Sequence, residues 1–180
     1  RTGSNNTFFG NYLLGLSVCD RSVKDCGNMY GFGGFGNGHV IRNNYIEGGN
    51  GGINLGWGTE KFDTNGSLWN SAVQANTSWP TTNTVIANNT FVNTVSKKTN
   101  VSSTFQNTSN RKRKWVANGS VVAIADIPPT NNTFDSNIVF NTNSSASIPA
   151  VRMVNVGKQV WKNNYVWPNT IPLGDRLSGV

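Results

Sequence analysis

The chain has 180 residues and a mass of 19.5 kDa, which fits one domain or part of a larger one. Only 13% of the residues are charged and 36% are hydrophobic, and the 29 Asn and 20 Gly that replace them argue against a helical protein. The net charge is +7, which allows an acidic partner, yet four of the fifteen cations lie in one run at 111–114.

Five copies of one sequence phrase run along the chain. Each has a bulky apolar residue, an Asn three positions later and another apolar residue two positions after that. Asn enters the left-handed backbone region at low cost, so the phrase predicts a strand, a bend at the Asn and a second strand. The intervals of 33, 45, 48 and 27 residues indicate a constant core with loops of varying length. The five positions are Asn11, Asn44, Asn89, Asn137 and Asn164.

Short strands rich in Val, Ile and Phe are expected on both sides of each Asn. The preceding strands are predicted at 39–41, 84–86, 132–134 and 159–161, and the following ones at 45–46, 90–92, 138–140 and 165–167. A third strand in each coil is expected at 51–57, 120–126 and 150–154. The Gly-rich stretch 30–38 is interpreted as a flexible corner or as close backbone packing beside aromatic rings. Long corner insertions are expected at about 58–82 and 94–118.

The repeated pattern "VIRNNYI", "VIANNTF" and "VWKNNYV" resembles the right-handed parallel β-helix of the pectate-lyase-like superfamily. The resemblance covers roughly residues 5–170 and implies an all-β, single-stranded, three-sheet solenoid of about five coils as one domain over 1–180. It also implies that the five Asn residues form a stacked ladder at one bend. The superfamily includes lyases, hydrolases, epimerases, tailspikes, adhesins and structural proteins, so the resemblance leaves the function open.

Physical chemistry supports the ladder independently. A buried Asn amide has two donor hydrogens and an acceptor oxygen that need partners, and Asn stacked on Asn provides them. A short solenoid also exposes strand edges at both ends. We therefore expect either a fragment of a longer solenoid or end-to-end self-association of this chain with its neighbours.

The cysteines and the Asn-x-Ser/Thr triplets bear on the compartment. Cys19 and Cys26 are compatible with a small disulfide loop, and two buried thiols are the alternative. The chain opens on Arg1 and not on Met, which is compatible with removal of a start segment. Nine acceptor triplets favour a secreted glycoprotein carrying N-glycans, although an Asn-rich solenoid also produces such triplets by composition. The acceptors are Asn5, Asn65, Asn76, Asn88, Asn100, Asn107, Asn118, Asn131 and Asn143.

Catalytic chemistry has few candidates. The eight acidic residues include no Asp-Asp pair, which argues against a glycoside hydrolase. A lyase needs a basic residue near the sugar α-carbon, often with Ca²⁺ held by carboxylates. Asp126 and Arg152, expected in adjacent coils, are the only pair that fits, and a simple ion pair is the alternative. No cofactor is expected otherwise.

The remaining conspicuous residues have ordinary structural readings. The single histidine, His39, is expected to be structural, and no cluster of His or Cys predicts a metal site. The basic run is a solvated loop, a polyanion contact or a processing site, and its composition does not support nucleic-acid binding. Four Trp residues, if exposed, can stack on sugar rings, and a Trp in an insertion can instead anchor that loop to the coil. They are Trp57, Trp69, Trp79 and Trp167.

The sequence is therefore compatible with two functions. The first is a secreted, N-glycosylated, non-catalytic β-helix module that is structural or contacts glycans outside the cell. The second is a portion of a polysaccharide lyase or glycoside hydrolase acting on an acidic polysaccharide. Neither requires a membrane span, since no apolar run is long enough.

Overall fold

The fold is described from a computed structural model. It defines residues 4–16, 31–34, 36–49, 51–56, 58–61, 80–94, 104–107, 113–117, 120–142, 150–153 and 156–167. This part of the chain consists of strands and turns, and it contains no helix that is long and apolar enough to cross a membrane.

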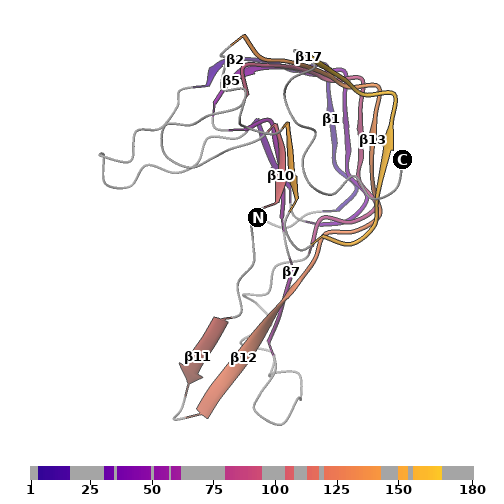
Figure 1. The fold of residues 1–180 in the computed structure, drawn as a ribbon. Coiled ribbons are helices and arrows are strands. Elements are labelled where there is room, and N and C mark those ends of the chain that lie inside the picture. Colours follow the sequence, from indigo (N-terminus) through magenta and orange to yellow (C-terminus); the bar gives the residue numbers. More distant parts are fainter. Residues whose placement is uncertain are drawn as a thin grey trace.

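The chain folds as a right-handed parallel β-helix of about five coils, as predicted (Figure 1). The first sheet holds β1 (Thr7–Phe9), β4 (Val40–Arg42), β8 (Val85–Ala87), β13 (Asn132–Asp135) and β16 (Gln159–Lys162). The second holds β2 (Tyr12–Leu16), β5 (Tyr45–Gly48), β9 (Thr90–Val92), β14 (Ile138–Phe140) and β17 (Tyr165–Trp167). The third holds β3 (Phe32–Gly34), β6 (Ile53–Leu55), β10 (Phe105–Asn107) and β15 (Val151–Met153).

A fourth sheet is antiparallel and extends away from the stacked coils (Figure 1). It consists of β7 (Gly58–Lys61), β11 (Arg113–Ala117) and β12 (Ser120–Ile127). The prediction that 120–126 is a coil strand was therefore wrong, because this segment pairs antiparallel with β11 and β7. The third-sheet strand of that coil is β10, which lies inside the range 94–118 expected to be an insertion.

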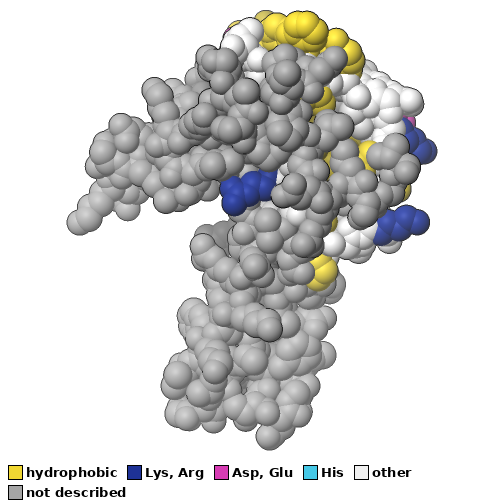
Figure 2. Space-filling model, in the orientation of Figure 1, with side chains coloured by type: hydrophobic (Ala, Val, Ile, Leu, Met, Phe, Trp, Pro, Cys, Tyr) yellow, Lys and Arg dark blue, Asp and Glu magenta, His cyan; other side chains and the backbone are white. Residues whose placement is uncertain are grey.

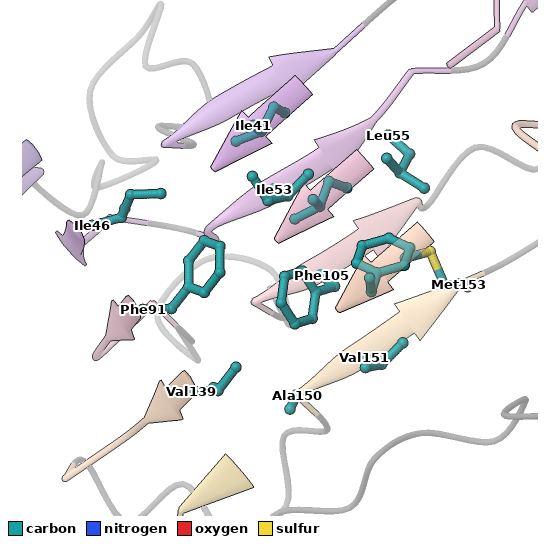
Figure 3. Packing of buried hydrophobic residues seen from close by; sticks show 12 residues of the cluster. Ile41, Ile46, Ile53, Leu55, Phe91, Phe105, Val139, Ala150, Val151 and Met153 are labelled. Carbon is teal, nitrogen blue, oxygen red and sulfur yellow. The ribbon is translucent and has the colours of Figure 1, made fainter. Parts of the chain in front are cut away.

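The core fills the space between the three parallel sheets (Figure 3). In each strand beside the Asn corner the middle residue points inward, so that Ile46, Phe91 and Val139 from successive coils are fully buried. Phe105 packs edge-on against Phe91, with ring centroids 5.0 Å apart. Each such side chain contributes about 1.5–3 kcal/mol through burial. Apolar contact between successive coils therefore holds the three sheets together.

Two Gly residues allow the third sheet to approach the core closely. A Cβ atom on Gly52 would lie 2.5 Å from Cδ1 of Phe91, and one on Gly31 would lie 2.7 Å from Cγ2 of Ile46. Larger residues would push these side chains out of the core. Of the two interpretations of the Gly-rich stretch, Gly31 shows close packing, although against Ile46 and not against an aromatic ring. This stretch also contains the strand β3, which was not predicted.

The Asn ladder is present at the corner between the first and second sheets, as predicted. In every step the Asn of one coil donates from its backbone N–H and from Nδ2 to Oδ1 of the next Asn, at 2.8–3.1 Å. The second Nδ2 hydrogen bonds a backbone carbonyl, as from Asn89 to Ile41 at 2.9 Å. The amides of the middle coils therefore have all their partners. The ladder runs through Asn11, Asn44, Asn89, Asn137 and Asn164.

The left-handed bend lies one residue earlier than predicted. The residue before each ladder Asn has a positive φ, between 51° and 68°, whereas no ladder Asn does. The ladder side chain thus points inward from a strand-like backbone, and its neighbour makes the turn. The five turn residues are Gly10, Asn43, Asn88, Ser136 and Asn163.

A second polar column, not anticipated from the sequence, lines the other corner of the first sheet. Its members lie five residues before each ladder Asn. Asn132 Oδ1 accepts from Thr84 N at 3.0 Å, and Gln159 Oε1 accepts from Asn132 N at 3.2 Å. His39 Nδ1 accepts from Asn6 N at 3.3 Å. The single histidine is 5% exposed and belongs to this structural column, as its structural reading predicted. Its five positions are Asn6, His39, Thr84, Asn132 and Gln159, and these bonds join the first two and the last three.

Candidate functional site

The outer surface of the second sheet carries the main concentration of aromatic side chains on the described surface. Because side chains alternate along a strand, the residues on either side of each buried one point outward. Five of these ten outward positions are aromatic. We call this surface the aromatic face. It comprises Tyr12, Leu14, Tyr45, Glu47, Thr90, Val92, Ile138, Phe140, Tyr165 and Trp167.

The aromatic face is open to solvent at both ends. Tyr12 is 66% exposed at the first coil, and Tyr165 and Trp167 are 54% and 46% exposed at the fifth. Figure 2 shows hydrophobic side chains gathered along the edge of the molecule where β2 and β17 lie in Figure 1. Exposed apolar side chains gathered on one surface mark contact sites, because soluble domains rarely leave much such surface uncovered.

Polar groups are built into one end of the aromatic face. The rings of Tyr12 and Tyr45 stack with centroids 4.7 Å apart. The Tyr45 hydroxyl donates to Glu47 Oε2 at 2.9 Å. This hydrogen bond, together with partial desolvation and the carboxylate charge, raises the pKa of Tyr45 above its ordinary value. The phenol donates its hydrogen to the carboxylate and keeps the lone pairs of its own oxygen available as acceptors.

The aromatic face has a signal in the sequence that is spread over the five repeats. Every ladder Asn is followed at the first and third positions by outward residues, as in Asn44-Tyr45-Ile46-Glu47 and Asn164-Tyr165-Val166-Trp167. Of the four Trp residues considered for sugar stacking, Trp167 lies on this face. The other three, Trp57, Trp69 and Trp79, lie outside the described residues.

The outer row of the third sheet is the second candidate surface. It brings Asn54, Gln106 and Arg152 into register on adjacent strands. Arg152 is exposed, whereas Gln106 is only 1% exposed. Asp126 does not lie in this row: it sits in β12, paired with Thr59 in the antiparallel sheet. The structure therefore places the two proposed lyase residues in different sheets.

The acceptor triplets fall into three groups. Asn5, Asn88 and Asn131 are exposed turn residues with φ of 58°, 53° and 56°. Asn107 is 1% exposed and its Nδ2 donates to Leu55 O at 2.7 Å, so its amide is enclosed in the folded chain. The other acceptors and both cysteines lie outside the described residues: Asn65, Asn76, Asn100, Asn118, Asn143, Cys19 and Cys26.

The fold itself explains some of these triplets. At 88–90 a left-handed Asn, a ladder Asn and the Thr that opens β9 follow one another, which generates Asn-x-Thr. At the equivalent corners Asn43 and Asn163 are followed two positions later by Tyr45 and Tyr165, so no triplet forms. Triplets at these corners are therefore weak evidence for glycosylation.

Other chemistry is sparse in the described part of the chain. No group of three or more His, Cys, Asp or Glu residues that could hold a metal ion occurs there. The basic run lies partly in β11, from Arg113 onward, and its side chains are outside the described set. The aromatic face and the outer row with Arg152 are thus the two surfaces available for a functional argument.

Comparisons with known proteins add little to these surfaces. No family model matches the chain, and no curated protein matches it. The chain is similar to the solved structure of the alginate lyase AlyF-OU02 in complex with G6, with a TM-score of 0.48 and 21% sequence identity. The match covers 97% of this chain and 36% of that one, so this chain spans about a third of its length. A likeness at this level carries no conclusion about function, and the fold stands on the sheet topology.

Proposed function

We propose that this chain is a secreted, N-glycosylated, non-catalytic β-helix module that contacts polysaccharide through the aromatic face. The observation that carries the proposal is the set of outward rings on one parallel sheet, with exposed Tyr12 and half-buried Tyr45 at one end and exposed Phe140, Tyr165 and Trp167 at the other. Pyranose rings have apolar C–H faces that stack on such rings, while their hydroxyls need polar partners.

The composition of the face favours a glycan over a protein partner. A protein interface core is depleted of charge, whereas Glu47 lies here among the rings. Tyr12, Tyr45 and Tyr165 each combine an apolar body with a hydroxyl tip. A sugar chain uses both properties at once, because every residue of the chain presents an apolar face and a rim of hydroxyls.

Secretion and glycosylation are supported mainly by the exposed acceptors Asn5 and Asn131, because the triplet at Asn88 also follows from the geometry of the ladder corner. Asn5, Asn88 and Asn131 lie on turns where an attached glycan would be solvated. The proposal leaves out Asn107, whose amide is buried. Peptide mapping of the chain secreted from a eukaryotic host tests this: glycan is expected at one or more of the three exposed sites. Glycan on Asn107, or none on the three, would overturn this part of the proposal.

Binding to polysaccharide is tested by retention on an insoluble glycan. The variant Tyr165→Ala/Trp167→Ala removes two adjacent exposed rings, so retention should fall by about tenfold or more. Phe9→Ala is the matched control, because Phe9 is 56% exposed but lies in the first sheet against Arg42. It should leave retention unchanged. Equal losses in both variants, or no retention of the parent chain on any polysaccharide, would overturn the proposal.

The second candidate is a portion of a polysaccharide lyase, favoured by the exposed Arg152 beside Gln106 and Asn54. A lyase would use a base to remove the proton next to the uronate carboxylate, and Ca²⁺ would neutralise that carboxylate. Incubation with a uronan and Ca²⁺, followed by ultraviolet detection of the unsaturated product, separates the candidates. Product that disappears in Arg152→Ala would favour the lyase, and our proposal expects none.

A further inference from the structure

The charges of the described residues are divided unequally among the three parallel sheets. Among the ten positions of the aromatic face the only charged residue is Glu47. Arg42, Asp135 and Lys162 lie in the outer row of the first sheet, and Arg152 lies in that of the third. The ten positions of the aromatic face therefore carry no cationic side chain, although the chain as a whole has a positive net charge. A carboxylate or sulfate on a bound sugar would meet a negative side chain there.

The rings form two clusters separated along the coil axis. One cluster contains Tyr12 and Tyr45 on the first two coils, and the other contains Phe140, Tyr165 and Trp167 on the last two. The middle coil contributes only small side chains. Since neighbouring parallel strands lie about 4.8 Å apart, the facing members of the two clusters, Tyr45 and Phe140, are two coil steps or roughly 10 Å apart, and the cluster centres are three steps or roughly 14 Å apart. One sugar can touch only one cluster, whereas an extended chain along the axis touches both.

The hydrogen-bonded pair of Tyr45 and Glu47 presents oxygen atoms that accept hydrogen bonds. The Tyr45 hydroxyl donates its hydrogen to Glu47. The carboxylate and the phenol oxygen therefore offer lone pairs to a ligand and have no hydrogen left to donate. Sugar hydroxyls donate to such oxygens, whereas a uronate carboxylate is itself an acceptor and gains nothing from them. The hydrogen-bonding capacity of this pair and its negative charge thus both favour a neutral glycan over a uronate-bearing one.

We propose that the aromatic face binds a neutral, extended glycan along the coil axis and discriminates against uronate-bearing chains through Glu47. This rests on the proposed function, because it names the glycan class for the same surface. It differs from the lyase alternative in the ligand and in the surface that binds it. The lyase alternative needs an acidic polysaccharide and the outer row of the third sheet.

The test compares a neutral glucan oligosaccharide with a uronan oligosaccharide of equal length, titrated calorimetrically at low salt. The parent chain should bind the glucan at least about tenfold more tightly, which is the effect of one unfavourable charge contact. Glu47→Gln keeps an acceptor oxygen and removes the charge. It should bring the two affinities within about threefold of each other, by tightening uronan binding.

Length dependence tests the axial placement. A glucan of about six sugars reaches both clusters and should bind at least tenfold more tightly than a disaccharide. Tyr12→Ala should weaken the long glucan and leave the disaccharide bound at the far cluster. Equal affinity for both lengths would show that the ligand does not run along the coils and would overturn that part of the inference.

Failure of the inference can be told from failure of the proposed function. If the uronan binds as tightly as the glucan and Tyr165→Ala/Trp167→Ala abolishes both, the face contacts glycans but the charge argument is wrong. If neither oligosaccharide binds, or if binding survives in that variant, the proposed function itself is wrong. A glucan preference that persists unchanged in Glu47→Gln would also overturn the role given to Glu47.

Discussion

The two corners that border the first sheet solve the same problem with different side chains. At the corner with the second sheet, all five coils use Asn. At the corner with the third sheet, the five positions hold Asn6, His39, Thr84, Asn132 and Gln159. Both columns are largely buried and repeat at the same intervals of 33, 45, 48 and 27 residues. The uniform column is visible in the sequence, and the mixed one is visible only in the structure.

The difference follows from the number of hydrogen bonds each corner requires. A ladder Asn such as Asn89 accepts twice at Oδ1 and donates twice from Nδ2. Only a primary amide at that reach provides both functions. In the mixed column the recurring requirement is an acceptor for the backbone N–H of the preceding coil, which Asn132 Oδ1, Gln159 Oε1 and His39 Nδ1 all meet. Fewer requirements allow more residue types.

The strongest test of this contrast is Asn89→Ala in the middle of the uniform ladder. It removes four hydrogen bonds and leaves the backbone N–H and amide of Asn44 without their acceptor. Unsatisfied buried groups are costly, so the free energy of unfolding should fall by about 3–5 kcal/mol. Guanidinium chloride denaturation followed by circular dichroism measures this change.

The matched control changes the adjacent residue. Asn88 is exposed and left-handed, with φ of 53°, and Gly adopts this conformation without strain. Asn88→Gly should therefore alter the free energy of unfolding by less than about 1 kcal/mol. A cost in Asn88→Gly equal to that in Asn89→Ala would mean that the bend, and not the ladder, carries the stability of this corner.

A smaller loss is expected from Asn132→Ala in the mixed column. The substitution removes the acceptor for Thr84 N and the donor to Thr81 O, at 3.0 and 2.9 Å. The expected loss is about 1–3 kcal/mol, because fewer groups are left unsatisfied than in the uniform ladder. The same denaturation experiment applies. A loss larger than that of Asn89→Ala would reverse the proposed order of the two corners.

Tolerance of the mixed column is tested at His39. Asn occupies the equivalent position in the first and fourth coils, so His39→Asn should change the free energy of unfolding by less than about 1 kcal/mol. His39→Leu has no acceptor for Asn6 N and should be the less stable of the two, by about 1 kcal/mol. Equal stability of the two variants would show that this coil does not need the acceptor.

Much of the coil was predictable from the sequence, because its repeated elements follow local rules. The Asn ladder and the strands beside it repeat in every coil, and all were found where the pattern put them. The strand β10 was missed because Phe105-Gln-Asn107 is short and only its Phe is apolar. The segment of β12 was misplaced because its apolar run resembles a buried strand, and periodicity does not distinguish parallel from antiparallel pairing.

The candidate site was less predictable for a related reason. In the sequence, the loop Trp residues stand out in the insertions and Asp126 stands out on an expected coil strand, each as a single residue. The aromatic face has no single conspicuous residue, because its rings come from strands up to 155 positions apart, from Tyr12 to Trp167. Only after the five coils are aligned on the ladder do these outward positions become neighbours.

The smallest expected effect lies on the exposed side of the same coils, at the hydrogen bond from Tyr45 to Glu47. The folded state raises the pKa of Tyr45, so it holds the phenolic proton more tightly than the unfolded chain does. The pair therefore stabilises the fold below the ordinary pKa of tyrosine, and this contribution disappears as the pH rises through the higher folded value. Glu47→Gln should lower the pKa of Tyr45 toward its ordinary value, which difference absorbance of the phenolate measures against Tyr45→Phe as a blank. An unchanged titration in Glu47→Gln would mean that the carboxylate does not act on the phenol, and would contradict the electrostatics assigned to this end of the face.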